Sequence, residues 1–358
     1  MIDRSPGETI KWYRCHVSKE DLAKLNQRSE ILGFLQTGGF LGILGLTGAA
    51  AYLSAGRLPW YAVACLVFFH ATCWHFLING FHELIHDSVF KTRTLNRFFL
   101  WVFSFLGQYN HVAFWASHTE HHKFTLHPPD DLEVVLPQKY TLKDFLLTAF
   151  VNVWGPWNFL MGNVRLSLGR LEGEWEHHLF DDNPRERRKL FNWARFLLLG
   201  HVAIAAVSCY FQCWMIPVLV TLAPHFGGAL HFLCNSSQHV GLCDNVPDFR
   251  LCCRTLYLNP FFQFLYWHMN FHTEHHMYAA VPCYNLPRLH RLIKHEMPAC
   301  PNGLVQTWKG ISAILKRQKI EPGYQYMAEL PVGLGNGKCP VQKVRVPAVS
   351  EVGVPILS

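Results

Sequence analysis

The sequence predicts an all-α integral membrane protein, with four transmembrane helices in two hairpins and a cytosolic helical cap. Three observations lead to this prediction. Half of the residues are hydrophobic and only 16% are charged, well below the ~25% typical of soluble domains. Four apolar runs approach the roughly 20 residues that a helix needs to cross a bilayer. Histidine-rich strings recur between and after these runs.

The first hairpin follows a polar segment, residues 1–29, in which we expect no cleavable signal peptide. This segment is expected to lie in the cytosol and to contain a short amphipathic helix near Val17–Leu25. The first apolar run covers 31–53 and the second covers 59–78, with only a tight turn between them. Two runs of this length joined by a turn predict a transmembrane hairpin.

The second hairpin is predicted over 193–213 and 214–234, with almost no loop. Trp193 and Trp214 begin the two runs, and 21 residues of helix place them about 31 Å apart, at opposite interfaces. Two other apolar stretches, 98–106 and 145–161, are too short or too interrupted by polar residues, glycine and proline. We expect both to be interfacial or re-entrant.

Lysine and arginine residues near the spans predict the orientation, because they favour the cytosolic side. They precede the first hairpin, lie between the hairpins and follow the second, whereas the hairpin turns offer only Arg57. Both termini and the middle segment, about 80–192, are therefore expected in the cytosol. We divide the chain into a cytosolic lead-in (1–29), a membrane domain (30–300), and a C-terminal helix with a poorly ordered tail (301–358).

The net charge of +7 is better explained by this topology than by nucleic-acid binding. The basic residues are dispersed, and no Lys/Arg-dense run is interleaved with aromatic residues. The chain has twelve cysteines but no Cys-x-x-Cys pair. We therefore predict neither a zinc ribbon nor a disulfide framework, and expect reduced, buried thiols.

One five-residue string, His-Thr-Glu-His-His, occurs twice, at 118–122 and 272–276. In a helix its first histidine shares a face with the last two, at i, i+3 and i+4. Three imidazoles on one side of one turn can grip a transition metal. Chance in a histidine-rich chain is the alternative, but it does not account for two copies with the same Thr-Glu filling.

Other histidines extend this pattern. His82 and His86 follow the second span at i and i+4, and His239 follows the fourth span, four residues after Asn235. All these histidines fall on the cytosolic side of the predicted topology. Nine imidazoles exceed the ligand set of one ion and suit two ions, with positions left for water or substrate. The candidate metal ligands are His82, His86, His118, His121, His122, His239, His272, His275 and His276. The carboxylates available to orient them are Glu83, Asp87, Glu120, Asp130, Asp131 and Glu274.

The order of these motifs resembles that of the membrane fatty-acid desaturase and hydroxylase superfamily, over roughly residues 30–300. The segment Phe271–Leu289 is similar to the last histidine box of the lipid-desaturase branch. The resemblance implies a centre of two Fe²⁺ ions held by the nine histidines, which uses O2 to remove hydrogen from an alkyl chain. It also implies that His239 is a ligand and that Asn235 acts through water. It further implies a separate electron donor of the cytochrome b5 or ferredoxin type, because no fused b5 motif (His-Pro-Gly-Gly) occurs.

We therefore expect an O2-dependent desaturase of a fatty-acyl lipid, in the endoplasmic reticulum of a eukaryote or the inner membrane of a bacterium. A hydroxylase, or a desaturase of a specialised small molecule, is the alternative on the same scaffold. A membrane zinc protease is an alternative from another class, because His82-Glu83-x-x-His86 matches its signature. It leaves both five-residue strings unexplained. A metal transporter is the non-enzyme alternative, but transporters tend to place polar ligands in mid-span.

Overall fold

The computed structural model describes residues 8–138 and 140–331. In this part of the chain, helices and loops make up the fold, and β-structure is limited to isolated bridges. The helices are α1 Lys19–Leu25, α2 Glu30–Ser54, α3 Trp60–Trp74, α4 Leu77–Ile85, α5 Arg93–Leu106, α6 His111–Phe124, α7 Leu142–Ala149, α8 Gly155–Ser167, α9 Gly173–Phe180, α10 Pro184–Tyr210, α11 Met215–Leu219, α12 Ala229–Asn235, α13 Phe249–Cys252, α14 Pro260–Leu265, α15 His272–Met277, α16 Leu286–Ile293 and α17 Gly303–Ile320. Short 3-10 turns are η1 Ala223–His225, η2 Cys283–Asn285 and η3 Lys294–Glu296.

Three helical stretches are long and apolar enough to cross a membrane: Glu30–Ser54, Trp60–Ile85 and Pro184–Tyr210. The first begins where the Ser29 hydroxyl accepts from the N–H of Leu32, and it ends before the turn at Gly56, whose φ is +74°. Many of its apolar side chains face outward, and Leu46 is 74% exposed. An apolar outer surface of this kind is stable when lipid surrounds it.

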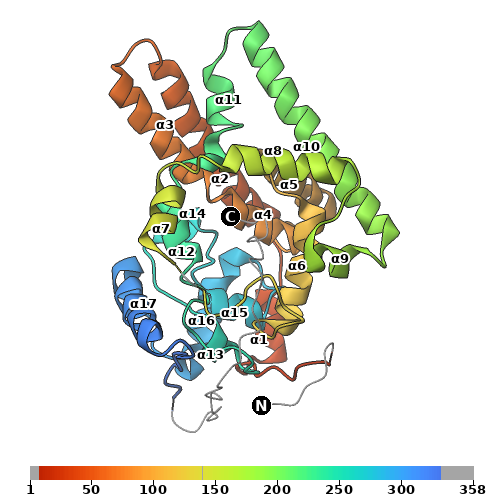
Figure 1. Cartoon of the computed structure of the whole chain (residues 1–358). Coiled ribbons are helices and arrows are strands. Elements are labelled where there is room, and N and C mark those ends of the chain that lie inside the picture. The colour runs from red at the N-terminus through yellow and green to blue at the C-terminus, as the bar shows by residue number, and fades with distance from the viewer. Residues whose placement is uncertain (1–7, 139, 332–358) are drawn as a thin grey trace.

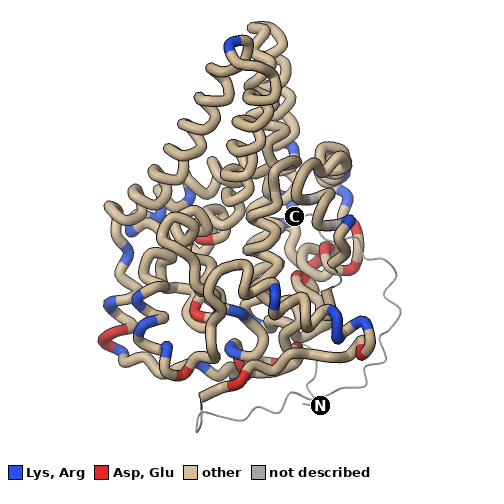
Figure 2. Tube along the Cα trace, turned by 90° about the vertical axis from the view of Figure 1, so that its left-hand side faces the viewer, with Lys and Arg blue, Asp and Glu red and all other residues tan. Residues whose placement is uncertain are grey.

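The spanning helices project together from one end of the molecule (Figure 1). α2 and α3 form one hairpin there, and α10 runs outward beside the segment that contains α11. Acidic and basic residues gather in the opposite part of the molecule, and the projecting end carries almost none (Figure 2). This separation of charge fits a membrane protein whose projecting end lies in the bilayer.

The fourth predicted span, 214–234, differs from the expectation, because the structure has no single helix there. It is divided into α11, η1 and α12. Pro224 lies in η1, and Gly227 adopts a φ of +78° between η1 and α12. Proline removes a backbone donor and a positive φ is incompatible with helix, so an apolar run of sufficient length does not form one continuous helix.

The breaks in this segment free backbone carbonyl groups, which need hydrogen-bond donors inside an apolar environment. Histidines of the second span provide them. His70 Nε2 lies 3.0 Å from the carbonyl oxygen of Leu219, and His75 Nε2 lies 3.0 Å from that of Phe226. These two histidines therefore support the irregular fourth segment, which is a structural role and not the mid-span metal binding expected of a transporter.

The two ambiguous apolar stretches form short helices. Residues 98–106 belong to α5, and residues 145–161 divide between α7 and α8. Neither stretch is among the helices long enough to cross a membrane. α8 lies across the base of α10 (Figure 1), and Trp154 and Trp157 at its start are exposed. Aromatic residues in such a position are typical of a membrane–water interface.

Candidate metal centre

The nine candidate histidines come from four separate segments that converge at one place. His82 lies on α4, near the end of the second span, and His86 caps the C-terminus of this helix. The first five-residue string ends α6, and the second forms α15. His239 lies in the turn that follows α12. Seven of the nine side chains are buried, and His86 and His122 are half-buried.

A first group of potential metal ligands contains five imidazoles, whose ligand atoms all lie within 4.8 Å of one another. Its members are His82, His86, His118, His122 and His275. The Nε2 atoms of His118 and His122 are 2.9 Å apart, and those of His122 and His275 are 3.2 Å apart. Four of the five rings thus belong to two neighbouring helices, α4 and α6, and the fifth comes from α15.

A second group contains His239, His272, His276 and, unexpectedly, Cys253. The Nε2 atom of His272 lies 2.9 Å from that of His239 and 3.1 Å from that of His276. The His121 ring lies beside this group, with its centroid 4.9 Å from that of His276 and 5.2 Å from that of His239. The sequence motifs gave no indication of the cysteine, although the adjacent pair Cys252–Cys253 is conspicuous in the sequence.

The two strings divide their histidines between the groups in opposite ways. In an α-helix, residues i and i+4 lie about 40° apart around the axis, whereas i+3 and i+4 differ by about 100°. Accordingly His118 and His122 serve the first group while His121 points to the second. In α15, His272 and His276 serve the second group while His275 points to the first. Each of the helices α6 and α15 therefore contributes two imidazoles to one group and one imidazole to the other.

The spacing of the nitrogens fits a transition-metal ion in each group. Two imidazoles bound at right angles, each about 2.1 Å from the ion, have nitrogens about 3.0 Å apart. The Nε2–Nε2 separations of 2.9–3.2 Å agree with this geometry. Imidazole also suits Fe(II), so the donor set fits the metal that the sequence resemblance implies.

The hydrogen bonds that fix the protonation of the second group also support a metal ion there. His239 Nδ1 donates to the carbonyl oxygen of Cys252 at 2.8 Å, which leaves its Nε2 as a lone pair. The hydroxyl of Thr125 donates to the His121 carbonyl, so His276 Nδ1 donates to Thr125 Oγ1 at 3.2 Å. The Nε2 lone pairs of His239 and His276 therefore both face His272 Nε2. His272 has at most one proton on this atom, so it can donate a hydrogen bond to only one of the two. A cation shared by all three nitrogens removes this conflict.

Buried carboxylates hold the imidazoles of α6. His121 Nδ1 lies 2.9 Å from Asp131 Oδ2, and His118 Nδ1 lies 3.0 Å from Glu133 Oε1. Asp131 also accepts from the backbone N–H groups of Leu126 and Glu133, which fixes its position in the loop after α6. Such partners orient a metal ligand and make it more basic. Asp131 was among the carboxylates expected from the sequence, whereas Glu133 was not, although it stands in an acidic run just after the first string.

Glu83 performs a similar function on the other side of the first group. One of its carboxylate oxygens lies 3.1 Å from His82 Nδ1 and 3.5 Å from His275 Nδ1, and the side chain is buried. In a zinc protease the glutamate of this motif activates a water molecule. Here the carboxylate contacts imidazoles, so its arrangement is that of a positioning residue.

Of four residues proposed as supporting groups from sequence, three have other contacts and the fourth, Asn235, is exposed. Asp87 pairs with Arg93 at 2.8 Å, because a positive φ of 58° turns the chain after α4. Glu120 pairs with Lys123 at 2.8 Å on the outer face of α6. Glu274 contacts His290 and Thr255, on the face of α15 opposite the ligands. Asn235 is exposed at the end of α12, because the chain leaves the helix there and a turn precedes His239.

Burial keeps most of these imidazoles neutral and therefore able to bind a metal. It lowers the pKa of His239 to about 3, and it lowers the pKa of five histidines of α6 and α15 well below the ordinary value: His118, His122, His272, His275 and His276. His121 is the exception. Burial opposes its charge, but the Asp131 carboxylate outweighs burial and raises the pKa of His121. The same pairing lowers the pKa of Asp131.

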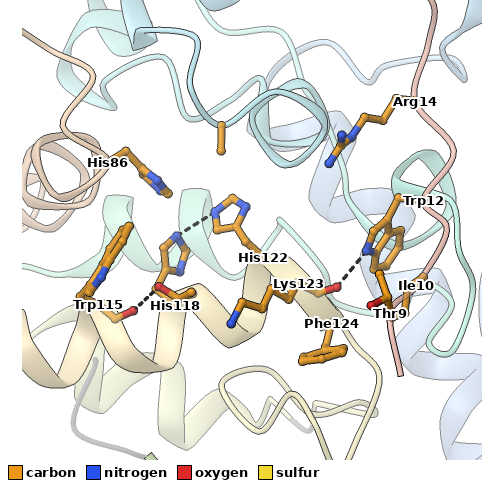
Figure 3. Close-up of a pocket in the computed structure, with 12 residues that line it drawn as sticks. Thr9, Ile10, Trp12, Arg14, His86, Trp115, His118, His122, Lys123 and Phe124 are labelled. Atoms are coloured by element: carbon orange, nitrogen blue, oxygen red, sulfur yellow. Dashed lines mark hydrogen bonds between the residues drawn. The ribbon is translucent and has the colours of Figure 1, made fainter. Parts of the chain in front are cut away.

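A pocket of about 470 Å³ opens onto the first group only (Figure 3). His86, His118 and His122 line its inner end, with Trp115 beside His86 and Arg14 on the far side. The N-terminal segment closes that side, where Trp12 Nε1 donates to the carbonyl oxygen of Lys123 at 2.9 Å. The first group is thus accessible from outside, whereas the members of the second group are all buried.

Comparisons with known proteins show the family to which the chain belongs. The family model "Fatty acid desaturase" matches residues 58–308, which include all nine histidines. A "Sphingolipid delta(4)-desaturase DES1-like" protein of Oryza sativa subsp. japonica is 24% identical over 272 residues, which cover 74% of this chain and 70% of that protein. The family model matches more than half of the chain, and the matched residues include the histidine motifs on which the sequence resemblance rests.

Proposed function

Because the chain belongs to the fatty acid desaturase family, we propose that it is an O2-dependent di-iron enzyme that introduces a double bond into the alkyl chain of a fatty-acyl lipid. Family membership makes it a desaturase-type oxidoreductase that acts on lipid in a membrane. The observation that supports a di-iron centre is the pair of imidazole groups with nitrogen spacings of 2.9–3.2 Å. The relative from rice, whose name refers to a sphingolipid, supports a long alkyl chain as the reacting part of the substrate.

Two ferrous ions would be held by the five imidazoles of the first group and by the second group together with His121. When bound, they supply the O2-derived oxidant that an unactivated C–H bond requires. The protein's own contribution is to hold the imidazoles in place through Asp131, Glu133 and Glu83, and to keep water away from the buried second group.

The proposed reaction also needs electrons. We propose a separate donor of the cytochrome b5 or ferredoxin type, which reaches the protein on the side where the pocket opens to the first group. Arg14 at this pocket is exposed and basic, which favours an acidic partner. The histidines and both termini would then lie in the cytosol, in the endoplasmic reticulum of a eukaryote or the inner membrane of a bacterium.

Glycosylation-site mapping in microsomes tests this orientation. Acceptor sequences inserted in the hairpin turns at 55–57 and 211–213 are expected to be glycosylated, because the proposed topology places these turns in the lumen. An acceptor inserted at 181–183, after α9, is expected to remain unmodified. Glycosylation at 181–183 would contradict the proposed topology.

Expression in a heterologous host, followed by profiling of lipids and polar metabolites, tests the reaction. We expect a new lipid that is two mass units lighter than a host lipid and contains one additional double bond. A product with an additional oxygen would replace the desaturase proposal with the hydroxylase alternative. A modified polar metabolite without any change in lipids would identify a small-molecule substrate.

A further inference from the structure

The second ligand group contains a sulfur atom that the histidine motifs do not explain. The ligand atoms of Cys253, His239, His272 and His276 all lie within 4.8 Å of one another. Cys253 is only 3% exposed. Of the eleven cysteines in the described part of the chain, it alone belongs to a potential ligand group.

Hydrogen bonds of residues on either side of Cys253 tie its segment to the two segments that carry the imidazoles. On one side, the carbonyl oxygen of the preceding residue, Cys252, accepts from His239 Nδ1 at 2.8 Å. On the other side, the N–H of Leu256 donates to the carbonyl oxygen of Asn270 at 3.0 Å, in the segment that leads into α15. The position of the sulfur is therefore set by the same contacts that position the imidazoles.

We propose that Cys253 binds the metal ion of the second group as a thiolate. This inference rests on one part of the proposed function, which is that a metal ion is bound by the second group. The metal–sulfur bond replaces the S–H bond, and the proton passes to solvent as the ion binds. Thiolate is a softer donor than imidazole and is used by iron, zinc and copper sites. The two ions are then chemically different: one has imidazoles beside an open pocket, and the other has imidazoles and a sulfur ligand that are all buried.

Cobalt substitution tests this ligand without any measurement of activity. The full-length protein is purified in detergent, depleted of metal and loaded with Co²⁺ alone. A cobalt–thiolate bond gives a charge-transfer band in the near ultraviolet, whereas cobalt–imidazole bonds do not. We expect this band in the wild-type protein, its loss in Cys253→Ser, and about two Co²⁺ bound per chain in both proteins.

Cys252→Ser is the matched control, because Cys252 is equally buried and its sulfur lies 3.9 Å from that of Cys253, outside the ligand group. The control is expected to keep the band. Absence of the band in the wild-type protein, or its persistence in Cys253→Ser, would overturn the inference.

A second measurement decides the matter if Cys253→Ser does not fold. X-ray absorption of zinc-loaded Cys252→Ser protein is expected to contain a sulfur neighbour at about 2.3 Å, besides nitrogens at about 2.1 Å. A shell of nitrogen and oxygen alone would overturn the inference. A wild-type protein that binds two ions through imidazoles alone refutes only the thiolate ligand, whereas a protein that binds no pair of ions refutes the proposed function itself.

Discussion

Substitution of His275 or His121 by alanine is expected to abolish turnover and to lower the bound iron from about two ions per chain to about one. His275 is fully buried in the first group, and His121 lies beside the second. In the described part of the chain, neither ligand group contains a histidine beyond the nine candidates. Changes to residues that merely support a ligand already cost 10–100-fold in metal affinity or activity, so we expect a loss of more than about 100-fold in turnover.

Iron content by elemental analysis and product formation in reconstituted membranes measure these two effects. His178→Ala is the matched control, because His178 is an exposed histidine stacked on Trp175 in α9 and belongs to neither group. It is expected to keep both iron ions and full turnover. A His275→Ala protein with two iron ions and normal turnover would contradict the assignment of the first group.

Substitution of Asp131 by asparagine is expected to have the second largest effect. Asp131 is fully buried and accepts hydrogen bonds from His121 and from two backbone N–H groups. Its pKa is held low, so the carboxylate is charged at neutral pH and the substitution removes a buried charge there. We expect iron affinity to fall about 10–100-fold. The metal-free protein should lose about 3–5 kcal/mol of unfolding free energy, as when one partner of a buried pair is removed.

Iron competition with a chelator and thermal unfolding in detergent measure these losses. Glu120→Gln is an informative control, because sequence reasoning placed Glu120 beside the metal ligands. The structure instead pairs it with Lys123 on the outer face of α6, where a surface ion pair contributes about 0–1 kcal/mol. It is expected to change neither iron affinity nor stability measurably. Equal losses in both variants would mean that α6 faces the metal ions differently.

Much of the candidate site could be predicted from sequence because its ligands follow local periodicity. The spacing i, i+3, i+4 places three imidazoles of one string on one side of a helix whatever the rest of the chain does. His82 and His86 likewise share a face by their spacing alone. The first three spans are also local features, since length and apolar composition suffice to identify them.

The fourth apolar run, 214–234, was predicted as a single span, but its division into α11, η1 and α12 could not be predicted in the same way. Its hydropathy is that of a membrane helix, but its backbone is broken near Pro224 and Gly227. Such breaks are tolerated only where donors from elsewhere satisfy the freed carbonyl groups. His70 and His75 provide these donors from about 150 residues away in the chain. A prediction made from neighbouring residues cannot identify hydrogen-bond donors that are this far away in the sequence.

The sequence alone determined which imidazoles are available and on which helical faces they lie, because helix geometry is a local property. Only the tertiary structure decided how they are shared. The packing of α6 against α15 sends His121 to one group and His275 to the other, and the folding of the segment after α13 brings Cys253 to the second group. The packing of the loop after α6 likewise makes Asp131 and Glu133, and not Glu120 or Glu274, the partners of His121 and His118. These outcomes depend on contacts between residues far apart in the chain, which no spacing within one segment specifies.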